Sequence, residues 1–209
     1  MQTTNDFNKI LKERRSIKRY DPTVKISREE MEEILTVATT APSSVNMQPW
    51  RFLVIESDEA KAQLAELAKF NSTQVETSAA VIAVFGDVQN VEYFDEIYDK
   101  AVEVGYMPQD VKDNIKQAFS SYFETISNED MKDVVLIDGG LVSMQIMLAA
   151  RAYGYDTNPI GGYEKEKVTE VFGMDKERHV PVMLISIGKA VDEGHPSVRL
   201  PINRVAEWK

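Results

Sequence analysis

Two short polar segments carry most of the side chains that could bind an anionic ligand. The first, residues 14–20, reads RRSIKRY, so two guanidinium groups, a hydroxyl group and an ammonium group lie within five residues. Such a set can satisfy the terminal oxygens of a phosphate group. The second, residues 41–50, reads APSSVNMQPW, and its hydroxyl and amide groups can pair with the edge of a heterocycle. Together the two segments predict a site for a planar, anionic ligand.

The charge distribution supports this interpretation and leaves a simpler one open. The chain of 209 residues has 24 basic and 34 acidic side chains, a net charge of −10. Residues 9–19 hold six basic residues and one acidic one, whereas residues 86–133 hold twelve acidic residues and four lysines. A basic segment on an acidic protein indicates an anion site, but it is also typical of a solvated helix end. The second segment, taken alone, is equally typical of an ordinary Pro/Ser/Asn loop.

The composition excludes several kinds of site. The absence of cysteine rules out disulfides, iron–sulfur clusters, thiolate zinc sites and a cysteine nucleophile. The two histidines, His179 and His195, are too few for a multi-histidine metal centre, so we expect no metal. No P-loop, G-x-G-x-x-G, G-x-S-x-G or H-E-x-x-H pattern occurs. An acidic chain without a second basic stripe is not expected to bind nucleic acid.

The hydropathy pattern indicates a cytoplasmic protein without a membrane span. The longest fully apolar run, residues 79–85, is far shorter than the roughly 20 residues that a span requires. The N-terminal residues lack the apolar region of a secretory signal.

Hydrophobic periodicity predicts alternating helices and strands in a single domain, residues 1–209. We expect helices at 6–14, from a capping box at Ser27 to before Pro42, from Ser57 to about 69, and at 129–153. We expect strands at 51–55, at 79–85, beginning at 155–158, and at 180–187. A helical excursion at about 88–127 and an irregular C-terminal arm at about 194–209 complete the chain. This order predicts an α+β fold, a three-layer α/β/α sandwich around four or five strands.

The expected helix at 129–153 is apolar around much of its circumference, which requires burial on more than one side. We therefore expect a dimer interface or a central position. Gly139 and Gly140 in its middle are unfavourable for a helix, so we expect close packing against another helix to offset them.

Four ordered motifs resemble the FMN-dependent nitroreductase family. They are RRS-x-K-x-YD at 14–21, PSS-x-N-x-QPW at 42–50, NPIGG at 158–162 and SVRLP at 197–201. They span almost the whole chain in the order and spacing of the family. The resemblance implies a central, mostly antiparallel sheet flanked by helices and an intertwined homodimer with FMN at the subunit interface.

The resemblance also implies which residues contact the flavin. Arg14, Arg15 and Ser16 would hold the phosphate and ribityl end, and Arg199 would return to the phosphate. Lys18 would lie near the pyrimidine edge of the ring. The remaining contacts from the same chain would be Asn71, Gln74, Pro159, Ile160, Gly161, Gly162 and Ser197. The contacts from the partner subunit would be Pro42, Ser43, Ser44 and Asn46.

Aromatic side chains could form the wall of a substrate slot. The candidates are Phe70, Tyr122 and Phe123, for which a place in the core of a helix face is an equally good interpretation.

Gln74 and Ser197 stand where many relatives have lysine. A cation near the ring stabilises the anionic reduced flavin, so we expect a lower flavin potential here than in those relatives.

No side chain is an evident acid–base catalyst, and the resemblance assigns the chemistry to flavin N5. The expected reaction is hydride transfer from NAD(P)H to a nitroaromatic, a quinone or a similar flat small-molecule acceptor, with ping-pong kinetics. Other flavin reactions on the same scaffold, of the azoline oxidase, dehalogenase or flavin-fragmenting type, are alternatives. A non-catalytic flavin-binding protein is a further alternative of a different class.

Overall fold

Four strands form one antiparallel sheet in the computed structural model, which describes residues 4–209. The strands are β1 (Trp50–Ile55), β2 (Ala80–Asp87), β3 (Asp156–Ile160) and β4 (His179–Gly188), in the order β1-β2-β4-β3. The predicted strands are confirmed, with ends displaced by one or two residues. β3 pairs with β4 from Asp156–Gly188 to Ile160–Leu184. Because β3 is an edge strand, Pro159 within it costs no ladder hydrogen bond on its free side.

Eight α-helices are found among the described residues. They are α1 (Phe7–Glu13), α2 (Arg28–Ala38), α3 (Asp58–Leu67), α4 (Ser72–Thr77), α5 (Phe94–Glu103), α6 (Gln109–Thr125), α7 (Asn128–Ala152) and α8 (Lys165–Val171). Short 3-10 turns are η1 (Ser44–Asn46), η2 (Lys69–Asn71), η3 (Asn90–Tyr93) and η4 (Ile202–Arg204). The side chains of Ser27 and Ser57 accept from the backbone N–H groups of Glu30 and Ala60, as the capping patterns predict. The sequence did not predict α4 and α8, whose six and seven residues are too short for a clear period.

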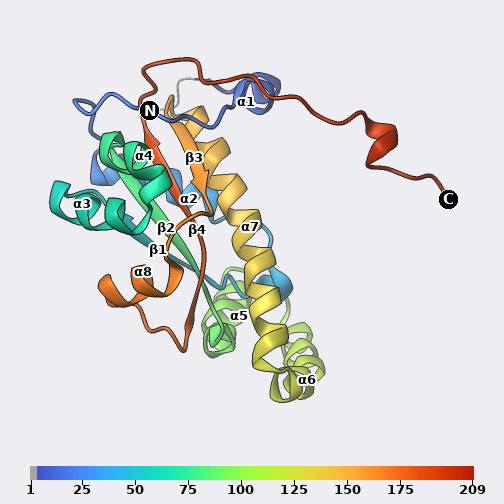
Figure 1. Cartoon of the computed structure of the whole chain (residues 1–209). Helices are drawn as coiled ribbons and strands as arrows, with labels where there is room; N and C mark the ends of the chain where they lie inside the picture. Colours follow the sequence, from blue (N-terminus) through green and yellow to red (C-terminus); the bar gives the residue numbers. More distant parts are fainter. Residues whose placement is uncertain (1–3) are drawn as a thin grey trace.

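The two faces of the sheet are covered by different helices, so the predicted three-layer α+β sandwich is confirmed (Figure 1). Inward side chains of α2 and α7 pack on one face, and those of α3, α4 and α8 pack on the other. The first face of the two central strands carries Ile82, Val84, Ile185 and Ile187. The second face carries Val81, Ala83, Phe85 and Leu184. Burial on both faces explains why residues 80–85 are apolar without alternation.

α7 approaches the sheet closely at two glycines. A Cβ atom at Gly139 would lie 2.5 Å from Cγ2 of Val182 on β4, and one at Gly86 of β2 would lie 2.6 Å from Val135 of α7. Only a hydrogen fits at either position. The sequence correctly predicted close packing at Gly139, but the expected helix partner is wrong, because the contact is with a strand. Nothing lies within 4 Å of a Cβ atom built at Gly140.

Part of the apolar surface of α7 remains uncovered in the single chain. Ile137 is 66% exposed, and Leu136, Leu141 and Met144 are between 37% and 43% exposed. Among residues 4–209, α7 alone is long and apolar enough to cross a membrane, but 50% of its most apolar stretch is buried inside the protein. Contacts with α2 and the strands account for that burial, so α7 is the central core helix with one bare stripe.

Residues 88–127 contain η3, α5 and α6, as the predicted helical excursion requires. A small separate core holds them, in which the rings of Phe94 and Tyr98 stack with centroids 4.2 Å apart and Met47 packs against them. The C-terminal arm extends away from the rest of the chain (Figure 1). Its apolar side chains are bare, with Val198 95% and Trp208 88% exposed.

Candidate functional site

The segment at 14–20 is fixed along the free edge of β3. The N–H group of Ile17 donates to the carbonyl of Thr157 (3.1 Å), and the side-chain amide of Asn158 donates to the carbonyl of Ile17 (2.9 Å). At its end, the buried Tyr20 hydroxyl donates to the carbonyl of Ser186 (3.2 Å). Ile17 and Tyr20 are buried, and the polar side chains of Lys18 and Arg19 between them lie at the surface of this edge.

Arg14 carries a buried nitrogen atom that has no partner among the described residues. Its Nη1 atom is buried, and no hydrogen-bond acceptor within residues 4–209 reaches it. Burial, and then the positive charges of Arg199 and Arg15, lower the pKa of Arg14. A half-buried guanidinium group beside like charge is unfavourable unless an anion joins it. The arrangement therefore fits a phosphate group.

Arg199 reaches this cluster from the C-terminal arm. Its Nη1 atom donates to Oγ of Ser197 (2.7 Å) and to the carbonyl of Val198 (3.1 Å). Ser197 thus orients the guanidinium group of Arg199.

The backbone beyond β3 leaves open space for a flat group. No atom lies within 4 Å of a Cβ atom built at Gly161, and only Nδ2 of Asn71, at 3.7 Å, approaches one built at Gly162. Asn71 donates to the carbonyl of Gly162 (3.2 Å) and accepts from Nε2 of the buried Gln74 (3.0 Å). Gln74 therefore fixes the orientation of the Asn71 amide beside that open backbone.

The loop at 42–48 has an unusual backbone. Val45, Asn46 and Gln48 have φ values of 45°, 54° and 48°, in the left-handed region that glycine normally occupies. For a β-branched residue such as Val45 this conformation costs about 1–2 kcal/mol. Strain of this kind concentrates at ligand sites, because the surrounding structure must maintain it.

The loop at 42–48 is held from two sides. Asp138 of α7 accepts from the N–H group of Ser44 with Oδ1 at 3.1 Å and Oδ2 at 3.0 Å. The Tyr98 hydroxyl of α5 donates to the carbonyl of Val45 (2.8 Å). The side chains of Pro42, Ser44 and Asn46 remain exposed.

The structure divides the predicted site residues into two groups. One group lies around β3 and consists of Arg14, Arg15, Ser16, Lys18, Phe70, Asn71, Gln74, Pro159, Ile160, Gly161, Gly162, Ser197 and Arg199. The other consists of the 42–48 loop with Tyr122 and Phe123, which line one small cavity together with Ser44 and Asp138. α1, which directly precedes Arg14, and α6, which carries Tyr122 and Phe123, lie at opposite ends of the molecule in Figure 1.

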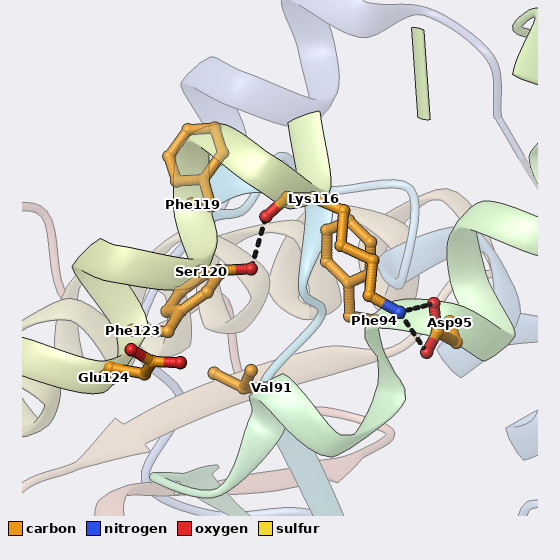
Figure 2. Close-up of a pocket in the computed structure, with 8 residues that line it drawn as sticks. All are labelled: Val91, Phe94, Asp95, Lys116, Phe119, Ser120, Phe123 and Glu124. Atoms are coloured by element: carbon orange, nitrogen blue, oxygen red, sulfur yellow. Dashed lines mark hydrogen bonds and ion pairs between the residues drawn. The ribbon is translucent and has the colours of Figure 1, made fainter. Parts of the chain in front are cut away.

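The three aromatic candidates have different surroundings. Phe70 is 98% exposed next to Asn71, and Tyr122 is 46% exposed. Phe123 is half-buried in the small core of α5 and α6. Figure 2 shows it on the wall of a cavity of about 300 Å³, with Phe94, Phe119 and an ion pair between Lys116 and Asp95 (2.7 Å).

Sequence reasoning missed Asp138 and Tyr98. A signal for Asp138 was present, since it lies between Val135 and Val142 on the buried face of α7, where a carboxylate is out of place. Tyr98 had no comparable signal. No group of three or more metal-ligating side chains occurs within residues 4–209.

Comparison with known proteins agrees with this geometry. The model of the Nitroreductase family matches residues 11–189. YdgI of Bacillus subtilis (strain 168), named as a candidate NAD(P)H nitroreductase, is 66% identical over 209 residues, the full length of both proteins. A candidate nitroreductase of Exiguobacterium sibiricum 255-15, crystallised in complex with FMN, is 64% identical with a TM-score of 0.97, covering 100% of this chain and 99% of that one. The CLA biosynthesis enone reductase of Lactiplantibacillus plantarum is 37% identical over 90% of this chain and 88% of that protein. By motif, fold and similarity over its full length, this chain belongs to the nitroreductase family.

Proposed function

We propose that this protein is an FMN-dependent oxidoreductase that transfers a hydride from NAD(P)H to flat electron acceptors such as nitroaromatics and quinones. The observation that carries the proposal is the half-buried guanidinium group of Arg14 beside two further arginines, whose buried Nη1 atom has no acceptor within residues 4–209. The FMN complex of the 64% identical protein and the name of YdgI support the same cofactor and donor. A reaction that consumes NAD(P)H takes place in the cytoplasm, where the donor is available.

Different residues around β3 hold different parts of FMN. Arg14, Arg15 and Arg199 neutralise the phosphate, and Ser197 holds Arg199 in place. Asn71 presents its amide beside the backbone of Gly161 and Gly162, which leaves room for the ring. FMN, when bound, supplies hydride acceptance and donation at its N5 atom. The protein supplies orientation and charge, and no side chain is required as an acid or base.

Donor and acceptor use one slot in turn. The sequence has no dinucleotide-binding glycine motif, so NAD(P)H is held mainly through its nicotinamide end. Phe70, Tyr122 and Phe123 form the wall of this slot. The resulting kinetics are ping-pong, and double-reciprocal plots at different acceptor concentrations are parallel.

The site is completed by a second copy of the chain. Within one chain, the 42–48 loop lies against α5, α6 and α7, whereas Arg15 and Asn71 lie with the residues around β3. The bare stripe of α7, the exposed apolar side chains of the arm and the family membership all support an intertwined homodimer.

The test is an anaerobic titration of the purified protein. We expect a yellow protein that releases about one FMN per chain on heating, and whose flavin absorbance bleaches on addition of NADH or NADPH. A quinone, a nitroaromatic and a conjugated enone are then added in separate experiments, the enone because of the 37% identical enone reductase. A compound that restores the flavin absorbance is identified as an electron acceptor. Bound flavin that neither donor bleaches would contradict the proposal and favour a non-catalytic flavoprotein.

A cation introduced at Gln74 is expected to raise the flavin potential. Gln74 is neutral, buried and hydrogen-bonded to Asn71. Gln74→Lys places a positive charge near the anionic reduced ring, and 1–2 kcal/mol of added attraction corresponds to a rise on the order of 30 mV for two electrons. The midpoint potential is measured with a reference dye. Thr73→Lys, on the exposed side of the same helix, is the control and leaves the potential near that of the wild type. An unchanged potential in Gln74→Lys contradicts this role.

A further inference from the structure

Asp138 is a buried carboxylate without a cation beside it. It lies on the inner face of α7, is 4% exposed and forms no ion pair with any residue from 4 to 209. Among the described residues, its hydrogen bonds come from the N–H group of Ser44, which donates to both carboxylate oxygens. Burial raises the pKa of Asp138, and the Ser44 N–H group opposes that shift. A carboxylate placed so unfavourably in a helix of the core suggests a role other than stability.

The N–H group that donates to Asp138 belongs to Ser44, at the start of the strained part of the loop. Ser44 directly precedes Val45, the β-branched residue with a φ of 45°. On the other side of the loop, the Tyr98 hydroxyl holds the carbonyl of Val45, and the N–H group of Gln48 donates to Oγ of Ser43 (3.0 Å). These contacts keep a conformation that an unrestrained loop would leave.

We infer that Asp138 is a positioning residue for the flavin site: by holding the N–H group of Ser44, it keeps Ser43, Ser44 and Asn46 in the geometry in which they line the FMN of a second copy of the chain. This inference rests on the proposed function. Asp138 itself does not touch the cofactor; it acts through the backbone of the loop. To hold the N–H group of Ser44, Asp138 needs an oxygen that accepts a hydrogen bond and does not need its negative charge.

Fluorescence titration of the FMN-free protein with FMN tests the inference. Asp138→Ala is expected to weaken FMN binding about tenfold or more, since the loop loses its anchor. Asp138→Asn keeps an oxygen that accepts from Ser44 and is expected to bind within about threefold of the wild type. Ser143→Ala is the matched control, because Ser143 is buried on the same helix and its hydroxyl has no partner within the described residues. If Asp138→Ala does not fold, Asp138→Leu, which fills the buried volume, replaces it with the same expectation.

A second substitution separates positioning from a general loss of stability. Glycine adopts left-handed φ values freely, so Val45→Gly removes the strain that the anchor maintains. The double variant Val45→Gly/Asp138→Ala is expected to recover most of the lost FMN affinity. Affinity that stays as low as in Asp138→Ala would assign the effect to damage of the core and overturn the inference.

Mixed dimers test whether the loop serves the other chain. Arg14→Ala and Asp138→Ala chains are co-expressed with different tags, and dimers that carry both tags are purified. If the loop of each chain lines the flavin of the other, one site has both defects and the other has none. The expected result is one tight FMN per two chains, although each parent dimer binds weakly. If no tight site is present, the loop serves its own chain and the inference is overturned.

The two proposals fail in different ways. Wild-type affinity in Asp138→Ala together with weak binding in Arg14→Ala contradicts the role of Asp138 and leaves the proposed function standing. Wild-type affinity in Arg14→Ala contradicts the flavin site itself.

Discussion

Replacement of Arg14 by alanine is expected to weaken FMN binding about 100-fold, or roughly 2.7 kcal/mol. Truncation of one partner of a buried, hydrogen-bonded charge pair typically costs about 2–5 kcal/mol, and the buried Nη1 atom of Arg14 has no other partner within residues 4–209. The same substitution is expected to stabilise the FMN-free protein, because it removes a half-buried cation that Arg199 and Arg15 repel. We expect the melting temperature of that form to rise by about 2–4 °C.

The two opposite effects are measured on one preparation, by fluorescence titration with FMN and by thermal unfolding without it. Arg19→Ala is the control, because Arg19 is an exposed cation in the same segment. It is expected to change FMN affinity by less than about threefold, through general charge alone. Weaker binding together with a lower melting temperature would mean that Arg14 supports the fold rather than the ligand.

Replacement of Asp87 by alanine is expected to have the largest effect on stability, a loss of about 3–5 kcal/mol. Asp87 is fully buried at the end of β2. Arg178 donates to it through Nε (2.8 Å) and Nη2 (2.9 Å), and Nη2 of Arg51 lies 2.9 Å from Oδ2. Without the carboxylate, both guanidinium groups lose their shared buried partner, and Arg178 keeps its contact with the more exposed Glu92 (3.1 Å).

Urea unfolding measures the loss, and Asp95→Ala provides the comparison. The ion pair between Asp95 and Lys116 is about half exposed on both sides, with 55% and 52% of the side chains accessible. Lys112, the second partner of Asp95 at 3.4 Å, keeps its ion pair with Asp99, so removal of the Asp95 carboxylate should change stability little. Equal losses in the two variants would contradict the importance of burial at Asp87.

The contribution of Asp87 also depends on pH. Burial alone would raise the pKa of Asp87, but the hydrogen bonds from Arg178 and the Gln89 N–H group and the charge of Arg51 outweigh it, so the pKa is lowered. A lowered pKa in the folded state stabilises the protein above the unfolded value of about 3.9. That stabilisation is lost as the pH falls through the folded value. The free energies of unfolding of wild type and Asp87→Asn are therefore expected to converge below about pH 4.

The sequence could predict those parts of the fold and site that depend on local patterns. The strand at 80–87 is an unbroken apolar run, and Ser27 and Ser57 mark helix starts by their own chemistry. The cluster around Arg14 could be predicted because three of its cations lie within five residues, and Arg199 was assigned through the resemblance. The three-layer order followed from the alternation of these elements.

Other parts depend on contacts between distant residues and could not be predicted. Nothing in the sequence around Val45 indicates a left-handed backbone, which exists because Asp138 and Tyr98 hold the loop from 94 and 53 residues away. The partner of Gly139 was assigned to the wrong kind of element, since a small residue indicates a close approach but not what approaches. Gln74 could be assigned to the site, but its hydrogen bond to Asn71 became evident only in three dimensions.

Under the proposed role of Asp138, the glycine contact between α7 and β4 is expected to make flavin retention sensitive to a residue that carries no functional group. Gly139 is the immediate neighbour of Asp138, and any side chain at 139 would meet Val182 at 2.5 Å and displace that turn of the helix outward. The carboxylate moves with its backbone and withdraws from Ser44. In a library of random substitutions screened by colony colour, colourless clones should therefore include changes at position 139. Changes of Gly140 to small residues should be rare among them, because the space there is empty.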